Sequence, residues 1–156
     1  MTSKHSDASV CRMTELVLPS QANALGTVFG GAIMSWVDLC GAISAQRHAG
    51  RRVVTAFVDD LVFEAPVRVG EVVRLEGRVT ATFRTSMEVE VVVTGEDPTS
   101  GRTWPCVQAL LTFVAIDAET RKPVPVPPLA LDDDLARAAQ AAGEERRARR
   151  LAKSHP

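Results

Sequence analysis

Residues 31–49 read GAIMSWVDLCGAISAQRHA, and this stretch decides the fold class. Apolar side chains stand at positions 33, 34, 36, 37, 39, 40, 42, 43 and 45, so the period-2 alternation of a strand does not survive here. Gly50 follows, where the C-cap glycine of a helix is expected. Because apolar residues fall on nearly every side, the pattern predicts one helix that is buried all round.

Extended segments surround this helix in the sequence. We expect strands at residues 12–18, 53–63, 71–83, 86–94 and 107–116, separated by Gly- and Pro-containing turns. The alternation is clear in 86–94, where valines at 89, 91 and 93 share one face and Glu88 and Glu90 the other. One buried helix with an antiparallel sheet of about five strands is an α+β arrangement.

The composition suits one soluble domain. The chain has 156 residues, 46% of them hydrophobic, and a formal net charge of −1. A near-neutral charge argues against nucleic acid or a membrane as a partner. The three cysteines are scattered and the first residues lack a signal-peptide pattern, so we expect a cytoplasmic protein without a spanning segment.

The two ends of the chain differ in character from its centre. We expect a flexible N-terminus at residues 1–11, a folded domain at 12–129 and a charged C-terminal tail at 130–156. Five of the nine prolines fall within 122–129 and end the domain. The alternating charges of the tail favour a solvated or frayed helix, with a docking segment as the alternative.

Few side chains in this sequence are suited to catalysis. Tyrosine is absent, and of the three histidines only His48 lies inside the expected domain, where it is either a partner of the helix dipole or a catalyst. Cys40 is expected to pack in the core. No zinc or phosphate-loop pattern occurs, so we expect no metal. Any chemistry must rest on carboxylates, amides and backbone groups.

Asp38 stands in the middle of the apolar helix. An unpaired carboxylate in a dry interior costs several kcal/mol, and no Lys or Arg lies three or four positions away. Ser35 offers only one hydrogen bond. Two interpretations stay open: the residue faces solvent or another subunit, or it faces a pocket as a base or nucleophile.

The loop before the helix contains further candidates. Asn23 starts the run NALGTVFGG, which ends with Gly30 and Gly31 at the helix start. Free first-turn amides and the helix dipole there suit an anion or oxyanion, about 10 Å along the axis from Asp38. Alternatively, the glycines only allow tight packing, and Asn23 only stabilises its own turn.

The run from residue 16 to 73 resembles the hotdog-fold acyl-CoA thioesterases of the cytosolic acyl-CoA hydrolase group. The resemblance rests on the arrangement N-x-x-G-x-x-F-G-G, followed after six residues by an aspartate. It continues through RTSM at 84–87, TFVAID at 112–117 and PVPPL at 125–129, and covers about residues 12–129.

This resemblance implies a function and a site. The protein would be an acyl-CoA thioesterase with a hotdog fold, in which Asp38 is the catalytic base or nucleophile and Asn23 its partner across a dimer interface. The amides of Gly30 and Gly31 would polarise the thioester carbonyl. The implied contacts of coenzyme A are Thr55, Arg84, Thr85, Ser86 and Arg51.

The resemblance also implies an oligomeric state, and two alternative functions stay open beside it. It predicts a homo-oligomer, a dimer of hotdogs and then a trimer of dimers, with coenzyme A only as part of substrate and product and no separate cofactor. Many relatives have an acidic residue where Gln21 stands, so hydrogen bonding in the loop is expected to differ. The alternatives are a non-catalytic acyl-CoA-binding protein and a hydratase or dehydratase, which would need a histidine in its site.

Overall fold

The structure is a computed structural model and describes residues 1–153. Two 3-10 turns, η1 (Ser6–Ser9) and η2 (Pro19–Gln21), accompany the regular elements. The helices and strands in chain order are β1 (Cys11–Leu16), α1 (Gly30–Ala49), β2 (Arg52–Phe63), β3 (Val72–Thr82), β4 (Ser86–Glu96), β5 (Thr103–Ile116) and α2 (Asp134–Lys153).

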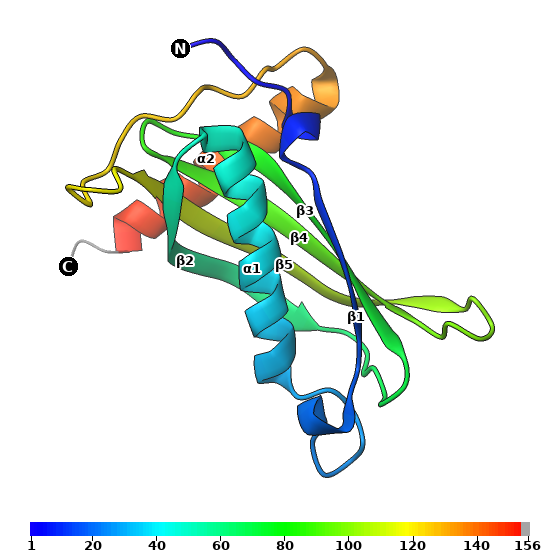
Figure 1. The fold of residues 1–156 in the computed structure, drawn as a ribbon. Coiled ribbons are helices and arrows are strands. Elements are labelled where there is room, and N and C mark those ends of the chain that lie inside the picture. Colours follow the sequence, from blue (N-terminus) through cyan, green and yellow to red (C-terminus); the bar gives the residue numbers. More distant parts are fainter. Residues whose placement is uncertain (154–156) are drawn as a thin grey trace.

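The five strands form one antiparallel sheet in the order β1-β3-β4-β5-β2, with α1 across one face (Figure 1). This confirms the expected α+β arrangement. The core lies between α1 and the sheet, where Val89, Val91 and Phe113 are fully buried. Contact is so close that a Cβ on Gly41 would lie 2.9 Å from the Phe113 ring.

The helix α1 is not buried all round in the single chain, so that part of the prediction is wrong. Met34, Leu39 and Ile43 are 49%, 52% and 36% exposed on the side turned away from the sheet. Apolar side chains of β2, including Val54 and Val62, are exposed as well. These exposed apolar side chains form one face of the single chain, and a face of this kind is typical of a surface that another protein surface covers.

β2 is an edge strand whose register changes at two places. It pairs with β5, with shifts between Thr55 and Phe57 and between Asp59 and Val62. The first shift places Thr55 opposite Phe113 and Phe57 opposite Thr112. Because Phe113 contacts α1, Thr55 shares the α1 face of the sheet and Phe57 lies on the other face.

The second helix, α2, packs on the sheet face opposite α1 (Figure 1). Arg146 donates two hydrogen bonds, of 2.8 and 2.7 Å, to the carboxylate of Glu88, which is 1% exposed. Gln140 exchanges two hydrogen bonds with the backbone of Thr82. The structure therefore differs from the expected solvated tail and favours the docking alternative; residues 154–156 of that tail lie outside the described part.

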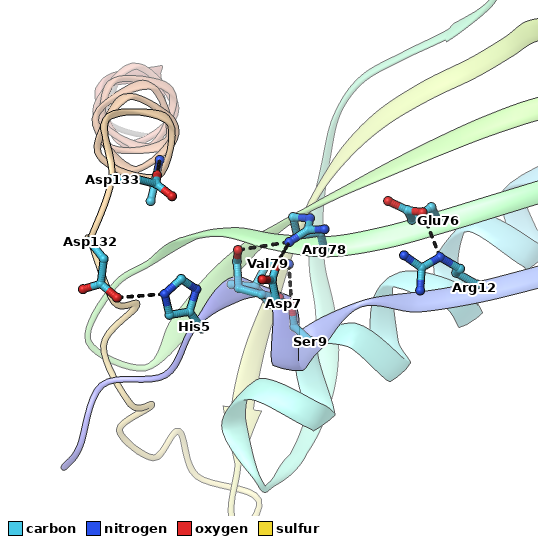
Figure 2. A network of polar contacts seen from close by, with 11 residues as sticks. His5, Asp7, Ser9, Arg12, Glu76, Arg78, Val79, Asp132 and Asp133 are labelled. Atoms are coloured by element: carbon cyan, nitrogen blue, oxygen red, sulfur yellow. Dashed lines mark hydrogen bonds and ion pairs between the residues drawn. The ribbon is translucent and has the colours of Figure 1, made fainter.

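The N-terminal residues also pack against the domain, in contrast to the expected flexible segment. Figure 2 shows His5 beside Asp132 and Arg78 paired with Asp7. Nε2 of His5 lies 2.7 Å from Oδ2 of Asp132. The amide of Val79 donates to the Ser9 hydroxyl at 2.9 Å. Polar contacts to β3 and to the segment before α2 thus hold this end of the chain.

Within residues 1–153, neither helix is long and apolar enough to cross a membrane.

Candidate active site

Asp38 and Thr55 meet between α1 and β2. The Thr55 hydroxyl donates a hydrogen bond of 2.6 Å to Oδ1 of Asp38. Asp38 is half-buried, and among residues 1–153 no lysine, arginine or histidine forms an ion pair with it. A carboxylate that is held by one hydroxyl and paired with no cation has its second oxygen free to act as a base or a nucleophile.

The sequence left open whether Asp38 faces solvent or another subunit, or instead faces a pocket, and its surroundings have features of both. Its neighbours Met34, Ser35 and Leu39 are exposed, so the carboxylate lies on the uncovered apolar side of α1. In the single chain this is an open surface; a second surface laid against it would turn it into a pocket. Thr55, and not Ser35, is the hydroxyl that reaches the carboxylate.

Gly30 and Gly31 form the first turn of α1. Their amides have no hydrogen-bond acceptor within the described residues, as expected for a helix N-terminus. Close packing also applies here, since a Cβ on Gly31 would lie 3.3 Å from the Phe29 ring and one on Gly30 3.4 Å from Phe63. Gly31 and Asp38 are seven residues apart, which places them on the same side of the helix.

Asn23 stabilises its own loop in the single chain. Its Oδ1 accepts hydrogen bonds from the amides of Leu25 and Thr27, at 2.9 and 3.2 Å, and from the Thr27 hydroxyl at 3.1 Å. This is the turn role that the sequence allowed as an alternative. No hydrogen bond joins Asn23 to Asp38 within residues 1–153, so their pairing across a dimer interface stays a prediction.

The residues expected to contact coenzyme A divide between two places. Thr55 lies beside Asp38. Arg84 and Thr85 lie in the turn between β3 and β4, and Ser86 begins β4, near the C-terminal end of α1. There the Val126 amide donates to the Arg84 carbonyl. Arg51 lies at the same end of α1 and lines a hollow of about 390 Å³.

The buried cysteines and His48 are poorly placed to act as nucleophiles or as an acid–base catalyst. Burial, with a further contribution from Cys11, raises the pKa of the Cys40 thiol to about 12, and burial raises the pKa of Cys106 to about 11. These thiols are not nucleophiles near neutral pH. His48 is fully buried and its Nε2 lies 2.7 Å from the Pro127 carbonyl, so it does not reach the Asp38 surface. Among residues 1–153 no cluster of side chains could hold a metal ion.

The link between Thr55 and Asp38 is the feature that sequence reasoning missed. The expected role of Thr55 was a coenzyme A contact. A single threonine in the apolar run VVTAFV is a weak signal, and its approach to a helix residue depends on how β2 lies against α1.

Comparison with known proteins identifies the family. The profile of the thioesterase superfamily matches residues 25–101. Mouse (Mus musculus) acyl-coenzyme A thioesterase 11 is 41% identical over 67% of this chain, which spans only 18% of that protein. An acyl-CoA thioester hydrolase of Zymomonas mobilis is 40% identical over 73% of this chain and 76% of its own length.

Solved structures agree with the sequence comparison. An apo-hexameric acyl-CoA thioesterase superposes with a TM-score of 0.92 at 35% identity, covering 99% of both chains. An acyl-CoA hydrolase from Staphylococcus aureus, solved with butyryl coenzyme A, has a TM-score of 0.87 at 33% identity over 97% of this chain and 92% of its own. Variants of that enzyme have an aspartate, an asparagine or a threonine replaced by alanine.

This chain belongs to the thioesterase superfamily and has its hotdog fold.

Proposed function

We propose that this protein hydrolyses acyl-CoA thioesters to a carboxylic acid and coenzyme A, with Asp38 as the reactive carboxylate. The hydrogen bond from Thr55 to Asp38 carries the proposal. It holds one carboxylate oxygen and leaves the other for water or substrate, and no Lys, Arg or His among residues 1–153 forms an ion pair with this carboxylate. Once a second surface covers this apolar face, an unpaired carboxylate there becomes costly, which argues for a functional reason to keep it.

The chemistry follows from these groups. As a base, Asp38 takes a proton from water while the oxygen attacks the thioester carbonyl; as a nucleophile, it attacks the carbonyl itself and water hydrolyses the resulting anhydride. In both routes the amides of Gly30 and Gly31 stabilise the oxyanion, and the coenzyme A thiolate leaves and is protonated. A thioester is electrophilic enough for a site without histidine.

The alanine variants of the Staphylococcus aureus enzyme support this assignment. Its three substituted residues follow in the order asparagine, aspartate, threonine, with the same sequence spacing as Asn23, Asp38 and Thr55. We therefore assign Thr55 to the catalytic pair, as the residue that orients Asp38. Asn23 is assigned to the same site in a partner subunit, and Arg51, Arg84, Thr85 and Ser86 to coenzyme A.

The exposed apolar side of α1 and β2 supports a homodimer, because a second copy would cover Leu39 and Val54 and close the pocket at Asp38. The similarity to a hexameric acyl-CoA thioesterase supports a trimer of such dimers.

A thiol-trapping assay with acyl-CoAs of increasing chain length tests the function. Wild-type protein should release coenzyme A over many turnovers, whereas Asp38→Asn should fold and reduce kcat at least about a thousandfold, as expected for loss of a base or nucleophile. Asp132→Asn, which changes an exposed aspartate paired with His5, is the matched control and should keep full activity. Binding of acyl-CoA without turnover by the wild type would instead support a non-catalytic binding protein.

A further inference from the structure

We propose that Arg150, on the far face of the sheet, is a positioning residue for the Thr55–Asp38 pair; the proposal rests on the function assigned above. Arg150 lies near the end of α2 and touches no group of the candidate active site. It contacts β2 on the other side of the sheet, at Phe57 and Asp59, which lie between the two register shifts of this strand.

Arg150 contacts β2 at two points. Its guanidinium donates a hydrogen bond of 2.9 Å to Oδ2 of Asp59 and lies 4.9 Å from the centre of the Phe57 ring. The ion pair is mostly shielded, with side-chain exposures of 16% and 20%. Shielding strengthens the attraction between the two charges, while burial still raises the pKa of Asp59, so removal of Arg150 would leave a poorly solvated carboxylate without its partner. The ring contact adds a cation–π attraction.

The bulge in β2 connects these contacts to the site. Phe57 is two residues from Thr55, and a register shift lies between them. Because of this shift, the side chain of Thr55 points toward Asp38 and that of Phe57 toward α2. The second shift follows directly after Asp59, where Asp60 has the unusual φ of 38°. A strand with two shifts, paired in the single chain only with β5, is less constrained than a central strand.

The remainder of α2 is anchored firmly enough to serve as a support. Glu88 in the middle of the sheet holds Arg146 one turn before Arg150. Gly143, one turn earlier, lies so close to the sheet that a Cβ on it would come within 2.4 Å of Ala81. Arg150 thus transmits a fixed position of α2 to the edge strand.

The expected consequence is a loss of turnover without loss of substrate binding. Without Arg150 the segment 55–59 can shift by a fraction of an ångström, and the Thr55 hydroxyl no longer holds Asp38 in one orientation. Misplacement by about 1 Å can cost about a hundredfold in rate, so for this smaller shift we expect roughly a tenfold drop in kcat for Arg150→Gln. The KM for acyl-CoA should change less than about twofold.

Two further variants isolate the contact. Arg150→Lys keeps the charge beside Asp59 and Phe57 and should recover most of kcat. Arg149→Gln removes the same charge from the preceding residue and should behave as wild type. The side chain of Arg149 is exposed and forms no ion pair or hydrogen bond in the described part of the chain. If Arg150→Gln reduces folding, Asp59→Asn removes the ion pair from the β2 side and should give the same drop in kcat with unchanged KM.

A double-variant cycle with Thr55→Val decides the question. If Arg150 acts through Thr55, adding Arg150→Gln to Thr55→Val should lower kcat by less than about twofold more. A full additional tenfold loss in that background would overturn the proposal and leave the assigned function intact. Failure of the function itself would be distinguishable, because wild type and Asp38→Asn would then turn over acyl-CoA equally.

Discussion

The Thr55 hydroxyl lies 2.6 Å from the Asp38 carboxylate and joins the edge strand β2 to the middle of α1. This bond fixes which carboxylate oxygen is free, so its loss should affect catalysis more than stability. Thr55→Val, which keeps the side-chain shape, should reduce kcat about ten- to a hundredfold in the thiol-release assay. Thr55→Ser retains the hydroxyl and should stay within about threefold of wild type; equal losses in both variants would contradict the role of the hydrogen bond.

The exposed apolar side of α1 gives a prediction about assembly. Leu39 is 52% exposed beside Asp38, and an aspartate there would place a charge in the proposed dimer interface. Leu39→Asp should yield monomers by light scattering and lose at least about tenfold in activity. Leu135→Asp changes an even more exposed leucine, 81%, in the first turn of α2 and should leave both mass and activity unchanged. An active oligomeric Leu39→Asp would place the interface elsewhere.

The path from sequence to fold was direct for the elements that have a regular pattern. The apolar run 31–49 and the alternating strand at 86–94 were located within one or two residues, because burial against a single sheet face determines both. The position of α2 was not predictable. Its Arg- and Glu-rich sequence is typical of a solvated helix, and the contact that docks it, Arg146 to Glu88, joins residues 58 positions apart.

Some residues of the candidate site could likewise be identified from the sequence, and others could not. Asp38, Gly30 and Gly31 could be found from sequence because each departs from its surroundings: a charge among apolar residues, and two glycines at a helix start. Thr55 does not stand out, because threonine is an ordinary residue in a strand. Its proposed role depends on a bulge in β2 that the local sequence does not encode. Asn23 could be found by resemblance, yet in a single chain its contacts show only a turn.

The close contact of Gly143 with the sheet leads to a stability prediction that runs against helix propensity. In an exposed helix position, Gly→Ala stabilises by about 1 kcal/mol. At Gly143 the added methyl would lie 2.4 Å from the Ala81 Cβ, so α2 must shift, and we expect a loss of about 1–3 kcal/mol in urea denaturation. Ala141→Gly, at an exposed position of the same helix, should lose about 1 kcal/mol through propensity alone. A more stable Gly143→Ala would mean that α2 does not pack on this face.

His48 predicts how stability depends on pH. Its Nε2–H donates to the Pro127 carbonyl, and its Nδ1 is buried without a partner, so a second proton would be a buried charge. Burial, opposed by the bond to Pro127 and reinforced by the charge of Lys4, lowers the pKa of His48 below its ordinary 6.5. The unfolded chain then binds the proton more readily than the folded one.

The stabilisation from a neutral His48 is therefore complete above pH 6.5 and is lost as the pH falls below that value. The free energy of unfolding from urea titrations should decrease by up to about 1.4 kcal/mol per pH unit from this residue as the pH falls from 6.5 toward the lowered pKa of the folded state. His48→Gln keeps a donor for Pro127 and does not titrate, so its slope should be shallower by that amount. His5→Gln, at the exposed pair with Asp132, should retain the wild-type contribution from His48. Identical slopes in wild type and His48→Gln would show that His48 takes up its proton equally in both states.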